Sequence, residues 1–284
     1  MNVNGVPAPG ARGGPGRGLC CAAGHLSQSV LISAPQEMAL RFGVLVLAAF
    51  PTAAPAASAW SDDFATFNAS LWTQQTDVEH CSDGACFNAR PDHLSYGPRG
   101  LEVSLNQRPC NATPSACCVA SKCAAWAAGH LASAAPALFG TFEITAQPAH
   151  SAGGSPPPKN AFSCWTPSYI GHPVHNEIAV CFSGLKSANT EIHFSYWFDA
   201  TAHTTVKQLP FAWGAAMHTY RVVWAPTFIS YLVDGVEMHR DTGVAGKTIP
   251  FTAGNELIII RPKNAVYAGD SYFNVKSASY DPAY

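Results

Sequence analysis

Charge is scarce in this sequence. Asp, Glu, Lys and Arg make up only 12% of the 284 residues, about half of the roughly 25% that is usual for soluble domains. The 16 basic and 18 acidic side chains leave a net charge of −2, so no broad basic surface is available to contact the phosphates of a nucleic acid. We therefore expect no nucleic-acid partner. The 48% hydrophobic content excludes a chain that is disordered throughout.

Cysteine pairs of the metal-binding type and membrane-length apolar runs are also missing. The ten cysteines include no C-x-x-C pair and no zinc-finger spacing, so their number favours disulfides in an oxidising compartment. The apolar run from Phe42 to Phe50 is about half of the ~20 residues that span a bilayer. We expect no cofactor, no membrane anchor and a monomer.

The first 59 residues have the composition of a leader. Residues 1–37 are rich in Gly, Pro, Ala and Arg without apolar periodicity, and we interpret them as a disordered extended leader or the product of an over-long gene model. Residues 38–59 combine one positive charge, the apolar run and the small residues Ala57-Ser58-Ala59, a pattern typical of a secretory signal peptide. We predict cleavage after Ala59 and a single secreted domain over residues 60–284, outside the cytosol or in a cell wall.

Two further features fit a secretory route. The sequons Asn68-Ala69-Ser70 and Asn111-Ala112-Thr113 have the form that this pathway glycosylates. Six cysteines lie in loop-like sequence before the main strands and could form up to three disulfides, whose pairing the spacing does not reveal: Cys81, Cys86, Cys110, Cys117, Cys118 and Cys123.

The rest of the chain alternates short β-type runs with turn residues. The runs are rich in Val, Ile, Phe, Tyr and Thr, no helical stripe competes with them, and Asp234-Gly235 suits a tight hairpin. This pattern predicts an all-β sandwich or jelly roll. The expected strands are Gly100–Asn106, Phe139–Ala146, Ala161–Thr166, His175–Ser183, Glu191–Asp199, His218–Ala225, Phe228–Asp234, Glu256–Arg261 and Ser271–Tyr280.

One predicted strand separates a core side from a cleft side. Residues two apart share a side of a strand, so Glu177, Ala179 and Cys181 lie together, while the apolar residues between them pack on the other side. The stretch His175-Asn176-Glu177-Ile178-Ala179-Val180-Cys181-Phe182 resembles the signature of family 16 glycoside hydrolases, the lichenase and laminarinase group with a concanavalin-like jelly roll. In that family the strand reads Glu-hydrophobic-Asp-hydrophobic-Glu.

The resemblance extends along most of the predicted domain. It is carried, in order, by Asp62-Asp63-Phe64 with Trp72, Gly129-His130-Leu131, Phe139-Gly140, Glu191-Ile192-His193-Phe194-Ser195-Tyr196-Trp197, and His218-Thr219-Tyr220-Arg221-Val222-Val223-Trp224 followed by Val233-Asp234-Gly235.

The resemblance implies retaining cleavage of a polysaccharide of the β-glucan type. In the family the first Glu is the nucleophile, the Asp tunes it, and the second Glu is the acid and base. Glu177 matches the nucleophile, but Ala179 replaces the Asp and Cys181 replaces the acid. A thiol at Cys181 could donate a proton, although its reach is shorter than that of a glutamate.

Histidines are the candidate substitutes for the missing acid. His193 should face the cleft from the next strand together with Ser195 and Trp197, and His175 flanks Glu177. Glu191 shares this alternation, but we expect it to be solvated at the strand's start. A zinc site built from His172, His175, Glu177 and His193 is an alternative without a known spacing to support it.

Aromatic and basic residues are the candidates for sugar binding. Trp165 and Trp197 match positions where the family presents rings to sugars, whereas Trp126 and Trp213 are expected in the core. With Trp165 in the cleft, Cys164 falls on the side opposite Cys181, so we predict two small buried cysteines that are not bonded to each other. Ser195 is a polar candidate, and Arg261 with Lys263 would favour an anionic or sulfated glycan if they face the cleft.

These residues support two main hypotheses of function. The first is a secreted endo-hydrolase or transglycosylase in which Glu177 is the nucleophile and a substitute residue is the acid. The second is a lectin-like wall or matrix protein that binds polysaccharide after losing catalysis. A third, structural crosslinking through Cys181 as a free thiol, ranks last. Fold analogy alone does not choose among them.

Overall fold

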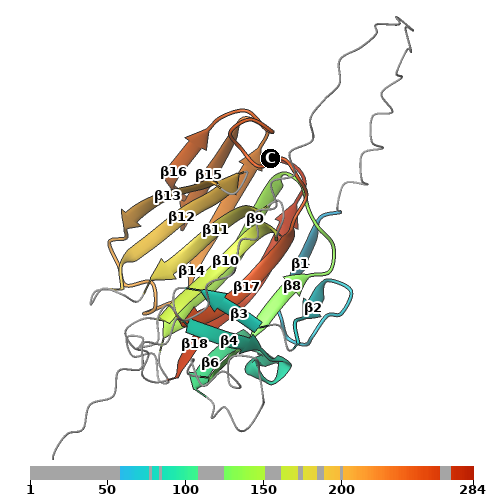
Figure 1. Cartoon of the computed structure of the whole chain (residues 1–284), viewed down its shortest axis with the longest axis vertical. Helices are drawn as coiled ribbons and strands as arrows, with labels where there is room; N and C mark the ends of the chain where they lie inside the picture. Colours follow the sequence, from blue (N-terminus) through green and yellow to red (C-terminus); the bar gives the residue numbers. More distant parts are fainter. Residues whose placement is uncertain are drawn as a thin grey trace, which may run out of the picture. The chain divides into compact units, whose positions relative to one another are not determined.

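The chain folds into two β-sheets that enclose a common core (Figure 1). The structure is a computed structural model, and it describes residues 58–76, 79–82, 85–107, 125–150, 161–171, 175–183, 189–198, 201–262 and 270–284. In these ranges every strand pair is antiparallel except β4 with β7. The predicted jelly-roll sandwich is therefore confirmed.

The larger sheet has eleven strands, nine of them in the order β16-β15-β14-β9-β18-β6-β7-β4-β3, with β1 beside β18 and β5 beside β6. Its strands are β1 (Trp60–Asp62), β3 (Glu79–Ser82), β4 (Ala85–Ala89), β5 (Leu94–Gly97), β6 (Gly100–Gln107), β7 (Ala125–Ala128), β9 (Gly140–His150), β14 (His218–Ala225), β15 (Phe228–Val233), β16 (Val236–Thr242) and β18 (Ser271–Asp281).

The smaller sheet has seven strands in the order β13-β12-β11-β10-β17-β8-β2. They are β2 (Trp72–Gln74), β8 (His130–Ser133), β10 (Ala161–Ile170), β11 (Asn176–Ser183), β12 (Glu191–Phe198), β13 (Thr201–Gln208) and β17 (Asn255–Pro262). A 3-10 turn, Pro91–His93, precedes β5. In the described ranges, no helix has the length and apolar character that a membrane crossing requires.

The core forms where the inward sides of the two sheets meet. In β11, Ile178, Val180 and Phe182 belong to this core, whereas Ala179 and Cys181 are buried in a separate cluster. Such alternation follows from the two-residue repeat of a strand. Trp126 and Trp213 are buried in the same core, which confirms that part of the prediction.

All nine expected strands are present, with ends shifted by a few residues at most. The Asp234-Gly235 hairpin is also confirmed, since both residues have positive φ angles of 48° and 78° and Val233 pairs with Val236 across the turn. The expectation that Cys81 and Cys86 lie in loops is wrong, because they are register partners in β3 and β4. Their side chains and the other four cysteines of that group lie outside the described residues.

Candidate active site

The side of the seven-stranded sheet turned away from the core carries most of the predicted site residues, and we call it the site face. Its centre is formed by neighbouring strands β11 and β12 (Figure 1). Their register pairs Glu177 with Trp197, Ala179 with Ser195 and Cys181 with His193. The buried residues between them point inward. The prediction that Glu177, Ala179, Cys181 and His193 share one face is therefore confirmed.

Trp165 does not lie on this face, and the prediction that it faces the cleft is wrong. It has no exposed surface, and its indole nitrogen donates a 2.6 Å hydrogen bond to Glu256 in the core. The register of β10 shifts between Trp165 and Ser168, around Pro167. Trp165 precedes the shift and pairs with the core residue Val180, so it turns inward. A bulge of this kind reverses the side-chain alternation after it, so Tyr169 lies on the site face beside Glu177.

Cys164 and Cys181 are joined by a disulfide, which corrects the prediction that they are not bonded to each other. They are direct register partners in β10 and β11, with Cα atoms 4.2 Å apart. The error follows from that for Trp165, because Cys164 lies on the site face when its neighbour Trp165 turns inward. The bond also excludes Cys181 as a free thiol, whether as crosslinker or as proton donor, since a disulfide sulfur carries no proton.

The disulfide forms part of an apolar patch on the site face. Phe162, Cys164, Ala179 and Cys181 are buried together, and Ile259 packs against them. The patch occupies the two positions where the resemblance implies a tuning Asp and an acid Glu. No proton donor is available at either position.

Glu177 forms a hydrogen bond with His175, its one side-chain partner among the described residues. The imidazole Nε2 donates to the carboxylate Oε2 over 3.0 Å. The imidazole also stacks on Trp197, with ring centroids 4.6 Å apart and planes 7° from parallel, and meets the edge of Tyr169 at 6.0 Å. Since Trp197 and Tyr169 are the register partners of Glu177, the carboxylate sits in an aromatic frame with the histidine fixed against it.

His193 has a different carboxylate partner, Glu191. His193 Nε2 donates to Glu191 Oε1 over 2.9 Å, and Gln208 donates to the other oxygen over 3.4 Å. Glu191 is only 7% exposed, so the expectation that it is solvated is wrong. Trp197, the register partner of Glu177, lies near one end of β12, and Glu191 lies at the other end. The hydrogen bond to Glu191 therefore directs the imidazole of His193 away from Glu177.

A cavity of about 590 Å³ adjoins the frame around Glu177. Tyr169 lies on its border with the frame, and Asn255, Leu257, His130, Thr73 and Gln75 line it from β17, β8 and the β2 region. Its size falls in the range of ligand pockets, and its mixed lining offers amide, hydroxyl and apolar groups to a ligand. The sequence pattern offered no signal for it, because its lining depends on the order of strands in the sheet.

The remaining predicted residues are only partly placed. Ser195 lies on the site face and its hydroxyl is 3.0 Å from that of Thr204 in β13. The backbone of Arg261 pairs with Phe162, but its side chain, Lys263 and His172 lie outside the described residues. Within the described ranges, no group of three or more His, Cys, Asp or Glu side chains is arranged to hold a metal ion.

One strongly shifted acid lies in the core directly behind the site. Burial raises the pKa of Glu256 to about 8, against the lowering effect of the hydrogen bond from Trp165. Its second oxygen has no hydrogen-bond partner among the described residues. An acid in this setting is held in its protonated form at neutral pH. The alternation of β17 predicts an inward side chain at position 256, but it does not predict the shift.

Comparison with known proteins places these features in a wider group. The model of the family described as glycosyl hydrolases family 16 matches residues 83–260. The beta-glucanases of Paenibacillus macerans and Paenibacillus polymyxa are 27% and 26% identical to the chain over 213 and 209 residues, which is 72% of this chain and 77% and 76% of theirs. A solved Bacillus licheniformis beta-glucanase matches with a TM-score of 0.64 at 20% identity, over 79% of this chain and 98% of that one, which shows a shared fold.

Proposed function

The chain belongs to glycosyl hydrolase family 16, and from this membership we propose that it binds a polysaccharide of the β-glucan type on the site face without cleaving it by the family's retaining route. The protein would then act as a lectin-like component of a wall or matrix.

The observation that carries this proposal is the Cys164–Cys181 disulfide. A retaining enzyme needs a second carboxyl about 5–5.5 Å from its nucleophile to protonate the leaving oxygen. The position that resembles the acid is occupied by a sulfur without a proton, and Ala179 next to it has no titratable group. Loss of general acid help alone typically lowers a rate ~10²–10⁴-fold.

Polysaccharide binding is supported by the groups that stay on the site face. Trp197 and Tyr169 can present apolar ring surface to a sugar, and Glu177 with His175 offers hydrogen-bonding groups between them. The adjoining cavity continues this surface across β17 and β8. Both of the Paenibacillus relatives are beta-glucanases, which suggests a β-glucan as the ligand.

Slow hydrolysis is the second candidate function, and the Glu177–His175 contact favours it. A carboxylate fixed by a histidine is a plausible nucleophile. His175 would also have to protonate the leaving oxygen, yet its Nε2 is committed to Glu177, and His193 is held by Glu191. These contacts make binding the preferred proposal.

We also propose that the protein is secreted. The disulfide on the site face fits an oxidising compartment, and the sequence of residues 38–59 has the pattern of a signal peptide. The full-length precursor expressed in a secretory host should release a protein that begins at Trp60. Retention of the whole chain in the cytosol would contradict this proposal.

The binding proposal is tested by comparing retention on insoluble β-glucans with sugar release. The wild-type protein should be retained on a β-1,3 or β-1,4 glucan while releasing little or no reducing sugar from β-1,3, β-1,4 and mixed-linkage substrates. Trp197→Ala should weaken binding by about 1–3 kcal/mol, as the loss of a stacking ring does elsewhere. Phe251→Ala, at an exposed aromatic residue that does not line the cavity beside Glu177, is the control. Fast hydrolysis that is lost in Glu177→Gln would contradict the proposal.

A further inference from the structure

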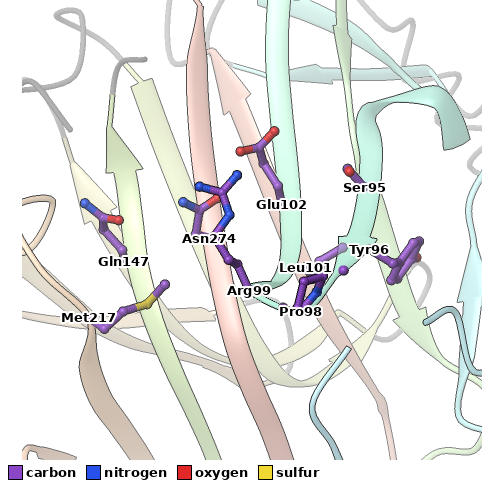
Figure 2. Close-up of a pocket in the computed structure, with 11 residues that line it drawn as sticks. Ser95, Tyr96, Pro98, Arg99, Leu101, Glu102, Gln147, Met217 and Asn274 are labelled. Carbon is purple, nitrogen blue, oxygen red and sulfur yellow. The ribbon is translucent and has the colours of Figure 1, made fainter. Parts of the chain in front are cut away.

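The eleven-stranded sheet carries a second cavity, on its side turned away from the core, which we call the outer cavity (Figure 2). Its volume is about 500 Å³, within the range typical of ligand sites. The floor is formed by β6, β18 and β9, one wall by β5 and its turn into β6, and the other by Met217 just before β14. The two sheets and the core separate it from Glu177.

Four polar residues form a row across the floor of the outer cavity. Ser95 pairs with Glu102, Glu102 with Asn274, and Asn274 with Gln147, so a hydroxyl, a carboxylate and two amides come from four adjacent strands. Three strand spacings of about 4.8 Å give the row a length of roughly 14 Å. The row is long enough to contact more than one sugar ring.

Arg99 adds a positive group above this row. It lies in the turn between β5 and β6, and Figure 2 shows its side chain extending in the direction of Asn274 and Glu102. The turn is held in place because Lys276 donates a 3.0 Å hydrogen bond to the carbonyl of Pro98. Gly100 follows with a φ of 101°, and a Cβ atom there would collide with the carbonyl of Val275, so the turn lies close against β18.

The charged groups of the outer cavity are not used by the fold. Neither Arg99 nor Glu102 has a hydrogen bond or ion pair to any residue that the structure describes, whereas Arg221 and Glu143 on the same side of the sheet pair with each other. Gln147 is oriented by a 2.9 Å hydrogen bond from its amide nitrogen to the carbonyl of Gly214. The outer cavity thus holds donors and acceptors at positions set by the strands.

An apolar group lies at one end of the row, where Met217 is 39% exposed beyond Gln147. Tyr96, which follows Ser95 in β5, points to the opposite side of that strand, where its hydroxyl accepts a 3.1 Å hydrogen bond from Gln74 and its ring packs against the core. Polar groups beside an apolar contact suit a sugar chain, because its hydroxyls donate and accept while its ring faces are apolar.

We propose that the outer cavity is a second carbohydrate site that binds a neutral oligosaccharide chain across Gln147, Asn274, Glu102 and Ser95, with Arg99 closing over it. The balance of one cation and one anion disfavours strongly charged glycans, since Glu102 repels a polyanion and Arg99 a polycation. The site is independent of Glu177 and of the proposed function of the site face. A protein with both sites could hold two glycan chains at once.

The four methionines of the chain permit a local test. The full chain is labelled with ¹³C at the methionine methyl groups, and the signals of Met217, in the outer cavity, and Met238, in β16, are assigned by Met→Leu substitution. Laminarihexaose, cellohexaose and an oligogalacturonate are then titrated. The neutral hexaoses should shift the Met217 signal saturably in the wild type and in Trp197→Ala, while the Met238 signal stays in place.

Variants of the outer cavity complete the test. Arg99→Ala and Asn274→Ala should each weaken the Met217 response about tenfold, the usual effect of losing one good hydrogen bond. Arg221→Ala, a matched arginine outside the cavity, should leave it unchanged. The proposal is overturned if the hexaoses do not shift Met217, if Arg99→Ala and Asn274→Ala respond like the wild type, or if the oligogalacturonate binds more tightly. Binding on the site face is read separately, from the difference that Trp197→Ala makes to glucan retention.

Discussion

At the scale of single residues, two positions on β11, Ala179 and Cys181, distinguish this chain from the family pattern it otherwise resembles. Glu177 lies on the site face with His175 against it. Ala179 and Cys181 follow Glu177 on the same side of β11, and Cys181 is bonded to Cys164 in β10. The nucleophile position is therefore present, and what the site face lacks is a proton donor for the leaving oxygen.

Restoring that donor should create activity. The triple variant Cys164→Ala, Ala179→Asp, Cys181→Glu removes the disulfide and places carboxylates at both missing positions. We expect reducing-sugar release from β-glucan to rise by ~10²–10⁴-fold over the wild type, the range that general acid help supplies. The same triple variant with Glu177→Gln is the control and should be inactive. Activity that survives in this control would show that Glu177 is not the nucleophile.

Glu256 should give the fold a distinct dependence on pH. Burial raises the pKa of Glu256 to about 8 from an ordinary value of 4.5. Its contribution to the free energy of unfolding is therefore fully present below pH 4.5 and is lost as the pH rises toward 8, with a slope of at most about 1.4 kcal/mol per pH unit. The cause is that the folded state retains a proton that the unfolded state has released.

The Glu256→Gln variant imitates the protonated side chain and should remove that slope. Urea unfolding at several pH values from 4 to 9 should show the variant gaining stability relative to the wild type as the pH rises. Glu143→Gln, at a surface ion pair, should run parallel to the wild type. Equal stability differences at pH 4 and pH 9 would rule out a buried, protonated Glu256.

At the scale of elements, the bulge in β10 decides which side chains reach the site face. Pro167 lies between Trp165 and Ser168, where the register with both β11 and β17 shifts. Proline cannot donate to a ladder and is tolerated in strands mainly at bulges or edges. Before the bulge Cys164 lies opposite Cys181, and after it Tyr169 lies opposite Glu177 on the site face.

The disulfide across β10 and β11 should contribute measurably to stability. It closes a segment with a sequence separation of 17, for which the loss of chain entropy in the unfolded state corresponds to about 3 kcal/mol. In urea unfolding, the double variant Cys164→Ala, Cys181→Ala should have a free energy of unfolding that is lower by about 3 kcal/mol. Mass mapping of the wild type should give a linked Cys164–Cys181 peptide that disappears on reduction. Recovery of both cysteines as free thiols from the oxidised protein would refute the bond.

The sequence predicts the positions of the strands better than it predicts which side of each strand faces the core. Alternating apolar residues were sufficient for β11 and β12, where no irregularity interrupts the two-residue repeat, and so Glu177 and His193 were placed correctly. In β10 the repeat also holds from Phe162 to Trp165, but it does not tell which side of the strand faces the core, and the family resemblance assigned Trp165 to the wrong side. The bulge around Pro167 then reverses the sides of the residues that follow it. The outer cavity could not be predicted at all, because its row of residues depends on the order of β5, β6, β18 and β9, which is not a local property of the chain.

At the scale of the whole molecule, the contacts of the first described strand bear on the prediction that the domain begins at residue 60. Trp60 in β1 pairs with Tyr280 in β18, and its ring meets the edge of Trp72 with centroids 5.3 Å apart. Trp72 in turn donates to Asp62 over 2.8 Å. The N-terminal strand of the predicted domain is thus tied both to the C-terminal strand and to the core.

A chain of residues 60–284 should therefore fold as stably as the full-length protein. The contacts of Trp60 are made within the retained part, so we expect the midpoint of urea unfolding to be unchanged and glucan retention to be kept. Removing three more residues, to give 63–284, deletes β1 and the acceptor of the Trp72 hydrogen bond, which should cost about 2–5 kcal/mol through lost burial and an unpaired indole. Both chains can be compared by intrinsic tryptophan fluorescence. Equal stability of the 60–284 and 63–284 chains would mean that β1 contributes nothing to the stability of the sandwich. A large loss of stability on removing residues 1–59 would mean that the predicted leader is part of the fold.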